Sequence, residues 1–285
     1  MLAWRNGEYI SVPDGAEVSQ IHDGPSLFET FALRAGRVEC LADHWHRLAI
    51  GCPRLGINAQ KLILGQSIDS QNWSPVLKKL LTNANLTDAI VRIIVVPRSD
   101  GLSTEWVTVR PLPPAVPSVD LYLLKTTRDK PEWLPRPKSG PWKNSSAALK
   151  ELKALTSRHD VEGIQLDTNG NISECTRSAI AWWNGDMWSL PANSTGCLPS
   201  TTANQFRGVL TQAKVPFHDV AAPFPKDARS ILILRSTLSG GANLVNKVLS
   251  TNGQIIWQAP ADQQHATAQM RALSDWRSQC SMNLA

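Results

Sequence analysis

The sequence predicts an α/β protein of mixed α+β type, built from two domains. β-Branched runs such as Ile90–Val96 alternate with stretches whose apolar residues recur at helical spacing, such as Leu41–Leu55. Between the two halves, Arg110–Val119 contains four prolines, which favour an extended linker over a helix. A chain of 285 residues is long enough to give each half its own core. We therefore expect a smaller N-terminal α/β domain at 1–115 and a larger C-terminal domain at 118–285.

The bulk composition argues against several classes of protein. Hydrophobic residues make up 42% of the chain and charged residues 19%, which is typical of a globular protein. The net charge of +5 is spread out, without a block of basic residues, so we expect no nucleic-acid partner. A small anionic substrate or cofactor fits this charge equally well. Because the sequence has no apolar run approaching a membrane span and no signal peptide, we also expect no membrane association.

Cysteine and histidine usage favours a reducing compartment and argues against a metal centre. The five cysteines are odd in number and form no C-x-x-C motif, which disfavours a disulfide scaffold. The six histidines are scattered, without Cys, Asp or Glu at ligand spacing, so we predict no metal site. We also find no G-x-S-x-G motif and no P-loop. The sequence therefore predicts a soluble, cytoplasmic protein.

The N-terminal half is expected to contain a hairpin, a strand, helices and a pair of strands. Within the first helix, His44 and Arg47 lie three residues apart and are neighbours on one face. We expect His44 to be structural, with a backbone or carboxylate partner. The expected segments are a hairpin in 1–12, a loop at Pro13–Gly24, a strand at Ser26–Leu33, a helix at Leu41–Leu55, one or two helices in Lys61–Asn85, and strands at Ile90–Val96 and Trp106–Arg110.

The C-terminal half alternates strands and helices, and Asn-Gly pairs mark three hairpins. The expected segments are a strand at Asp120–Thr127, a loop at Lys130–Pro141, a helix at Ala147–Leu155 capped by Ser145, paired strands at Ile164–Asp167 and Asn171–Cys175, a second pair at Ile180–Trp183 and Asp186–Leu190, a helix at Ala203–Ala213, a strand at Ile231–Leu234, a hairpin in Val248–Trp257 and a terminal helix at Pro260–Cys280.

A lysine and a glutamate, 31 residues apart, bracket the first of these helices and its following hairpin. Lys143 precedes the helix, and we expect its side chain to be buried in a cleft. Glu174 lies on the return strand of the hairpin. We predict a type I′ turn at Asn169-Gly170, because both central residues of that turn need a positive φ. Regular alternation then places Ile172, Glu174 and Thr176 on one face of the strand.

This pair of residue types suits one particular chemistry. A lysine amine can form an imine with an aldehyde cofactor such as pyridoxal 5′-phosphate, and a carboxylate against the ring nitrogen keeps that nitrogen protonated. Each residue also has an ordinary alternative, Lys143 as a solvated loop lysine and Glu174 as an exposed strand residue. Lys150 and Lys153 are rival lysines, although the polar face of a helix would hold both in water.

Four motifs in the same order resemble the class IV pyridoxal-phosphate aminotransferases and lyases. They are "DGPSLFETFALRAGRVECLADHWHRL", the lysine before a helix, "EGIQLDTNGNISECTRSAIAWW" and "GCLPSTT". The resemblance spans nearly the whole chain. It implies the two-domain fold of that family, pyridoxal 5′-phosphate as cofactor, a small anionic substrate, and a homodimer with the site near its interface.

The resemblance also implies a role for individual residues. Lys143 would bind the cofactor aldehyde, and Glu174 the ring nitrogen. Arg47, the Thr201–Thr202 backbone and Thr237 would bind the phosphate; Ser236 is the alternate for Thr237. Arginine suits phosphate because its planar fork donates two hydrogen bonds, and a helix N-terminus offers free N–H groups.

Ordinary alternatives remain for the phosphate residues: Arg47 as a surface helix arginine, and 200–202 as a simple helix cap. The chain departs from the family pattern in having Ser200 for glycine, Ala203 for arginine and Ala179 for asparagine. Arg98 is a weak candidate for binding a substrate carboxylate.

The segment Phe28-Glu29-Thr30 favours one branch of the family. A threonine at this place resembles the aminodeoxychorismate lyases, where its hydroxyl lies near the lysine. The implied reaction converts 4-amino-4-deoxychorismate into 4-aminobenzoate and pyruvate in folate precursor synthesis, and Lys143 would transfer the proton. An amino acid aminotransferase of the branched-chain or D-amino acid type is the alternative, and a non-catalytic pyridoxal-phosphate-binding paralogue is the third reading.

Overall fold

A computed structural model describes residues 1–12, 24–64, 70–129, 132–140 and 143–284. Strands and helices form two sheets with helical layers, so the predicted α/β class is confirmed. The loop expected at Pro13–Gly24 lies almost wholly outside the described residues, as do parts of the Lys61–Asn85 and Lys130–Pro141 segments. None of the described helices is long and apolar enough to cross a membrane.

The chain divides into two compact units, and each consists of more than one segment. The first unit comprises Met1–Pro113, Pro137–Pro141 and Ser278–Ala285, and the second comprises Pro114–Arg136 and Trp142–Arg277. The domain ranges 1–115 and 118–285 remain a prediction. They differ from the compact units because 137–141 and 278–285 belong to the first unit.

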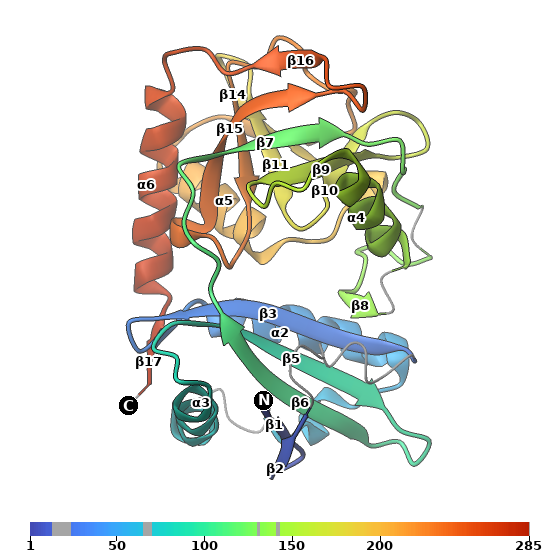
Figure 1. Cartoon of the computed structure of the whole chain (residues 1–285), viewed down its shortest axis with the longest axis vertical. Coiled ribbons are helices and arrows are strands. Elements are labelled where there is room, and N and C mark those ends of the chain that lie inside the picture. The colour runs from blue at the N-terminus through green and yellow to red at the C-terminus, as the bar shows by residue number, and fades with distance from the viewer. Residues whose placement is uncertain (13–23, 65–69, 130–131, 141–142, 285) are drawn as a thin grey trace. The chain divides into compact units, whose positions relative to one another are not determined.

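The first unit is an antiparallel sheet with helices on one face. Its elements are β1 (Leu2–Arg5), β2 (Glu8–Ser11), β3 (Ser26–Arg34), β4 (Arg37–Val38), α2 (Leu41–Gly51), the 3₁₀ turns η1 (Cys52–Leu55) and η2 (Ala59–Lys61), α3 (Ser70–Ala84), β5 (Ala89–Pro97), β6 (Ser103–Pro111), β8 (Ser139–Gly140) and β17 (Met282–Asn283). The strand order is β17-β4-β3-β5-β6-β1-β2, and β8 pairs with β3 (Figure 1). The β-branched run at Ile90–Val96 is the centre of β5 and pairs with β6, as predicted.

The helix expected at Leu41–Leu55 is shorter than predicted. The α-helix ends at Gly51, and the chain continues as the 3₁₀ turn η1, which contains Pro53. A proline has no N–H to donate along the helix, and its ring clashes with the preceding turn. Gly56 then ends the segment with a φ of 67°.

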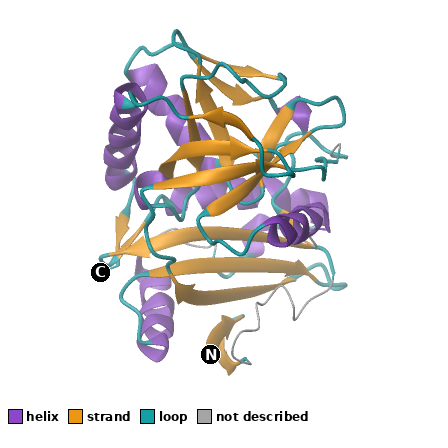
Figure 2. Ribbon diagram, turned by 45° about the horizontal axis from the view of Figure 1, so that its top comes forward, coloured by secondary structure: helices purple, strands orange, loops and turns teal. Residues whose placement is uncertain are grey.

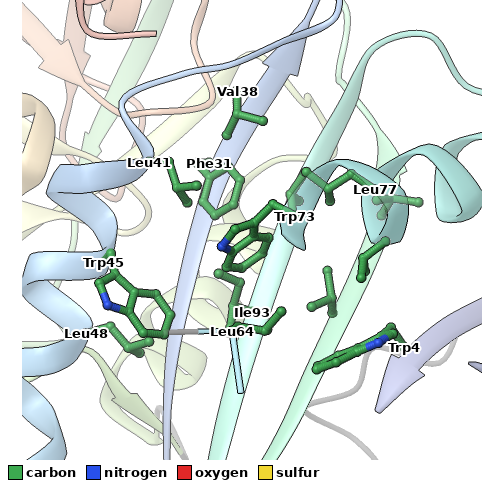
Figure 3. Close-up of a cluster of buried hydrophobic side chains, with 14 of the residues drawn as sticks. Trp4, Phe31, Val38, Leu41, Trp45, Leu48, Leu64, Trp73, Leu77 and Ile93 are labelled. Atoms are coloured by element: carbon green, nitrogen blue, oxygen red, sulfur yellow. The ribbon is translucent and has the colours of Figure 1, made fainter. Parts of the chain in front are cut away.

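Aromatic side chains from three elements make the centre of the first unit's core (Figure 3). Trp73 of α3 is 1% exposed and meets Phe31 of β3 and Trp45 of α2 edge to face, with ring centroids 6.5 and 6.4 Å away. Such offset geometry is favourable because a positive ring edge meets a negative ring face. These contacts hold both helices against the same face of the sheet.

A buried ionic cluster also joins α2 to β3. Glu29 is fully buried, and its Oε2 lies 2.7 Å from His44 Nδ1. Arg47 donates from Nε to Oε1 at 2.7 Å and from Nη2 to Oε2 at 2.6 Å, which is the bidentate geometry of a strong pair. Burial by itself raises the pKa of Glu29, but the charge and hydrogen bonds of Arg47, followed by those of His44, outweigh it and lower the pKa to about 2. The carboxylate partner expected for His44 is confirmed.

The second unit is a mixed sheet that carries three helices in the described part of the chain. Its elements are β7 (Ser118–Leu123), α4 (Lys143–Leu155), β9 (Val161–Leu166), β10 (Ile172–Cys175), β11 (Ala179–Trp183), β12 (Trp188–Pro191), η3 (Asn193–Thr195), α5 (Thr201–Gln212), β13 (Phe217–Val220), β14 (Ser230–Leu234), η4 (Ser239–Gly241), β15 (Ala242–Leu249), β16 (Ile255–Gln258) and α6 (Gln264–Gln279). The strand order is β10-β9-β7-β15-β14-β11-β12-β13, with β16 beside β15. Figure 2 shows the purple helices lying along this layer of strands.

These helices cover the same face of the second unit's sheet. Successive side chains of a strand point to opposite faces. Trp182 belongs to the apolar cluster on one face, whereas its neighbour Ala181 packs with α5 and α6 on the other. Ile164 and Val161 divide in the same way, and Val161 packs with α4. A polar residue on this second face therefore lies on the side where α4 and α5 begin.

An irregularity in β10 decides the direction of Glu174. Ile172 and Glu174 pair with consecutive residues of β9, and Gln165 is the partner of Glu174. Two steps on β10 thus match one step on β9, which is a β-bulge at Ser173. Ile172 remains in the apolar cluster, whereas Glu174 points with Gln165 to the helix-covered face. The expectation that Ile172, Glu174 and Thr176 share one face is wrong, because the bulge resets the alternation.

The predicted hairpin between β9 and β10 is confirmed, but its turn differs from the expected type I′. Gly170 has a φ of 85°, whereas Asn169 does not have a positive φ. The Gly170 N–H donates to the Asp167 carbonyl at 3.1 Å, and the Asp167 carboxylate accepts from the backbone N–H groups of Asn169 and Asn171. The Asp167 side chain thus stabilises the turn through hydrogen bonds to the backbone, as Asp and Asn commonly do in turns.

The Glu29 cluster makes the stability of the first unit depend on pH. Glu29→Gln should lower the free energy of unfolding at pH 7 by about 3 kcal/mol, the equivalent of a pKa lowered from 4.5 to about 2. The contribution of Glu29 is present above pH 4.5 and is lost as the pH falls towards 2, because the unfolded carboxyl is protonated first. The difference between wild type and variant should therefore shrink between pH 5 and pH 3.

Denaturant unfolding at each pH measures this difference, and the exposed Glu8→Gln is the matched control. That control should stay within about 0.5 kcal/mol of wild type throughout. A Glu29→Gln difference of the same size at pH 7 and pH 3 would contradict the assignment.

Candidate active site

Lys143 is the first residue of α4, four residues earlier than the predicted start of that helix. Its side chain is exposed, not buried as expected. The rivals Lys150 and Lys153 lie further along the helix and are also exposed, as expected for a polar helix face. Lys143 therefore differs from its rivals by its place at the helix N-terminus, beside a polar network.

The two residues after Lys143 are held by an arginine that lies outside every sequence motif. Ser145 is 4% exposed and is not the cap, because it lies inside the first turn. Its Oγ accepts a hydrogen bond from Arg128 Nη1 at 2.9 Å. Asn144 Oδ1 accepts from the same nitrogen at 3.1 Å and from Gln165 Nε2 at 2.9 Å. The start of α4 is thus fixed by side chains of other segments.

Glu174 is 9% exposed and each of its carboxylate oxygens has a partner. Oε1 lies 2.7 Å from Arg128 Nη2, and Oε2 accepts the N–H of Leu198 at 3.2 Å. Arg128 is 3% exposed, so this is a buried ion pair with charge-assisted hydrogen bonds. A carboxylate held this way keeps one orientation and still has lone pairs for a ligand.

Two buried cysteines whose pKa values respond to the charge of Glu174 are poor nucleophiles. Burial, with a further contribution from the charge of Glu174, raises the pKa of Cys197 to about 11. Burial is also the main cause that raises the pKa of Cys175. Because the thiolate is the reactive form, thiol chemistry at neutral pH is not favoured here.

The N-terminus of α5 offers donors for an anion. Ser200 is the N-cap, and its Oγ accepts from the Ala203 N–H at 3.2 Å. The N–H groups of Thr201 and Thr202 belong to the first turn, where a helix leaves its donors without intrahelical partners. Thr202 Oγ1 is buried and makes no hydrogen bond within the described part of the chain. These groups form a set of donors suited to a phosphate.

The turn that carries Thr237 lies against this helix end. A Cβ on Gly241, whose φ is 87°, would lie 3.1 Å from Thr202 Cγ2 and 2.7 Å from Arg277 Cδ, so only glycine fits this close approach. Arg277 donates to the Ser236 carbonyl at 3.0 Å and to Gln205 Oε1 of α5 at 2.7 Å. The structure therefore brings Thr202 and the 235–241 turn together, and Thr237 lies buried within that turn.

Thr30 and Arg47 belong to the first unit. Thr30 is half-buried on β3 and is the cross-strand partner of Arg92 on β5. It lies on the face opposite Glu29, because neighbouring strand residues point to opposite sides. Arg47 lies on α2, on the side of Glu29. Their convergence with Lys143 remains a prediction.

Three further residues of the prediction have ordinary surroundings. Arg98 follows β5 and pairs with the exposed Asp100 at 2.6 Å. Ala179 begins β11 and pairs with Leu234. Ala203, where the family pattern has arginine, is 4% exposed within the apolar cluster of α5 and α6.

Sequence reasoning missed Arg128, Gln165 and Arg277. Arg128 follows β7 in a loop, and nothing in the surrounding residues distinguishes it from a solvated loop arginine. Gln165 had one usable signal, since it is a polar residue between the apolar Ile164 and Leu166. Its Oε1 is buried and makes no hydrogen bond among the described residues.

Solved structures of similar fold cover nearly the whole chain. A 4-amino-4-deoxychorismate lyase from Pseudomonas aeruginosa aligns with a TM-score of 0.70 at 20% identity, over 95% of this chain and 98% of that one. A branched-chain aminotransferase from Thermoproteus uzoniensis with norvaline has a TM-score of 0.76 at 15% identity, over 100% and 99%. The branched-chain amino acid aminotransferase from Escherichia coli has a TM-score of 0.71 at 18% identity, over 95% and 91%.

At these identities the likeness establishes the fold and not the reaction. No curated protein matches the sequence. The model of the amino-transferase class IV family matches residues 26–239, about three quarters of the chain. This range contains Thr30, Arg47, Lys143, Glu174 and Thr237. The chain therefore belongs to the class IV aminotransferases, a family of pyridoxal-phosphate-dependent enzymes.

Proposed function

We propose that this enzyme is a pyridoxal-phosphate-dependent 4-amino-4-deoxychorismate lyase that forms 4-aminobenzoate and pyruvate. The observation that carries the proposal is Thr30, which follows Phe28-Glu29 as in the lyase branch of the family. Its side chain lies on the face of β3 away from the buried Glu29 cluster. A hydroxyl in that position is not part of the ionic cluster that joins α2 to the sheet.

The residues of the second unit fit the cofactor chemically. Thr202 Oγ1 and Gln165 Oε1 are buried polar atoms with no hydrogen-bond partner among the described residues, as expected of groups that meet a ligand. Thr202 and the first-turn N–H groups of α5 suit a phosphate. Glu174 is a carboxylate for the ring nitrogen, and Lys143 is an amine beside the same network. Thr237 would complete the phosphate contacts, and Arg47, whose Nε and Nη2 bind Glu29, would contribute from the first unit.

Lys143, Glu174 and Thr30 would each have a separate role in the reaction. Pyridoxal phosphate supplies an aldehyde that condenses with amines and a ring that accepts electron density. Lys143 would hold the cofactor covalently, release it to the incoming amine and then move the proton from the amine-bearing carbon. Glu174 would hold a proton at the ring nitrogen. Thr30 would donate a hydrogen bond to Lys143 or to the departing three-carbon group.

Cationic side chains on the Thr30 face suit an anionic substrate. The guanidinium of Arg92 lies 5.4 Å from the centre of the Phe28 ring, and Lys138 Nζ lies 4.7 Å from it. Both charges lie on the first unit, near Thr30, whereas Arg98 pairs with Asp100 beyond the strand end. We therefore assign the substrate carboxylates to Arg92 in place of Arg98. Charge complementarity of this kind guides a small anion into its site.

An amino acid aminotransferase is the second candidate, because the branched-chain aminotransferases have the same fold. It would use Lys143 and Glu174 in the same way, but Lys143 would return the proton to a carbon of the cofactor, and the enzyme would release a keto acid.

We extend either proposal to a homodimer, as the family resemblance implies. If analytical ultracentrifugation gives the mass of a monomer for the fully active enzyme, the homodimer is wrong.

A product assay separates the two reactions. Purified enzyme should release 4-aminobenzoate and pyruvate in equal amounts from 4-amino-4-deoxychorismate and should be slow with amino acid and keto acid pairs. Thr30→Val, which keeps the shape but removes the hydroxyl, should lower kcat by about 10- to 100-fold and leave cofactor binding intact. Transamination without 4-aminobenzoate would overturn the lyase assignment.

Lysine substitutions test the catalytic assignment. Lys143→Ala should bind pyridoxal phosphate only non-covalently and lose turnover by several orders of magnitude, because one residue performs both binding and proton transfer. Lys150→Ala, on the same helix, is the matched control and should remain active. Borohydride reduction followed by peptide mapping identifies the lysine, and a pyridoxyl group on any other lysine would falsify the assignment.

A further inference from the structure

Arg128 joins the three segments from which the proposed cofactor contacts come. Its Nη2 binds Glu174 on β10, its Nη1 binds Asn144 and Ser145 at the start of α4, and its Nε lies 3.5 Å from the carbonyl of Gly196, just before α5. Its own backbone N–H donates to Leu166 at the end of β9 at 2.6 Å. The guanidinium is thus placed by the sheet and reaches the first turn of α4 and the segment that leads into α5.

A closed ring of contacts runs through this arginine. Asn144 accepts from Arg128 and Gln165, and its Nδ2 donates to the Thr127 carbonyl at 2.7 Å. Gln165 is in turn the cross-strand partner of Glu174, which binds Arg128. Because the links through Arg128 and Gln165 are short and buried or half-buried, the start of α4 cannot shift relative to β10 without breaking a hydrogen bond. Buried hydrogen-bond networks of this kind make the surrounding structure rigid.

We propose that Arg128 is the positioning residue that sets Glu174 relative to Lys143. The inference rests on the proposed roles of those two residues and holds for lyase and aminotransferase alike. The cofactor ring is rigid, so the carboxylate for its nitrogen and the amine for its aldehyde must lie a constant distance apart. Arg128 controls that distance because its planar fork binds one group directly and the neighbours of the other.

Arg136 provides a matched control in the same surroundings. Burial and the charge of Arg128 lower the pKa of Arg136, and the charges of Asp129 and Glu174 oppose that shift. The hydrogen bonds of Arg136 go to the carbonyl and carboxylate of Asp129, at 2.6 and 3.2 Å. Arg136→Gln therefore removes a nearby positive charge and leaves the contacts of Arg128 to Glu174 and α4 in place.

The test compares Arg128→Lys, Arg128→Met and Arg136→Gln with wild type as purified proteins. Both Arg128 variants should bind pyridoxal phosphate at least tenfold more weakly, measured by quenching of tryptophan fluorescence. Arg128→Lys keeps the charge but loses the fork, so it should lose kcat by about 100-fold, the cost of misplaced reacting groups. The pH midpoint of the absorbance change of the bound cofactor should also move. Arg136→Gln should keep the wild-type affinity and move the midpoint much less, because it removes a charge near Glu174 but no hydrogen bond to it.

Folding is separated from positioning by a double variant. Arg128→Met leaves Glu174 buried beside apolar groups, which should lower the melting temperature of the cofactor-free protein. Arg128→Met/Glu174→Gln should recover most of that loss, because both charges are removed, without restoring the cofactor spectrum. Recovery of the spectrum would overturn the proposal, as would equal effects of the Arg128 and Arg136 substitutions.

Failure of the underlying site is distinguishable from failure of this inference. Borohydride mapping to a lysine other than Lys143 removes the proposed site, and the role of Arg128 with it. Mapping to Lys143, combined with wild-type affinity and pH midpoint in Arg128→Lys, overturns the role of Arg128 alone.

Discussion

The β-bulge at Ser173 is the constraint on which the polar side of the second unit depends. Without it, regular alternation would direct Glu174 to the side of Ile172, among apolar side chains of the sheet. An isolated carboxylate there would lose its hydration and gain no partner, which is strongly unfavourable. One inserted residue instead points it to the face that α4 and α5 cover. The bulge interrupts the strand pairing locally. β-Bulges are common next to active sites, where they redirect a side chain.

Once Glu174 lies on that face, the surrounding elements follow from the need to pair its charge. A buried carboxylate is tolerated when a cation and hydrogen-bond donors satisfy it, and Arg128 and the Leu198 N–H do so. The same arginine then binds the first turn of α4. A second helix, α5, begins in the segment that follows Leu198. The N-terminus of α4 thus belongs to this polar network, and that of α5 follows three residues after Leu198. Each is the positive end of a helix dipole, which favours an anionic ligand.

The first unit uses the two faces of β3 for different purposes. On the helix-covered face, Glu29 is bound by His44 and by Nε and Nη2 of Arg47, and this cluster holds α2 in place. On the opposite face, Thr30 pairs with Arg92 and the cationic groups lie around Phe28. The alternation of one strand therefore places the Glu29 cluster and the basic surface on opposite faces of the sheet.

The sequence by itself determined the features that depend on local order. The β-branched run at Ile90–Val96, the helical spacing near Leu41 and the hairpin near Gly170 correspond to elements of the structure, and the motif order led to the family. These features follow from side-chain periodicity and from residues with unusual backbone freedom, which act within a few positions of one another.

Only the tertiary structure decided the direction of Glu174, the start of α4 at Lys143 and the place of Arg128. Each is set by a group distant in sequence: the register of β9 against β10, and hydrogen bonds across 16 and 17 residues from Arg128 to Asn144 and Ser145. A bulge has no sequence signature of its own, and an arginine reaches its partners through a long side chain. The physical reason is that such contacts depend on which distant segments the fold brings together. The periodicity of side chains along the sequence does not reveal those neighbours.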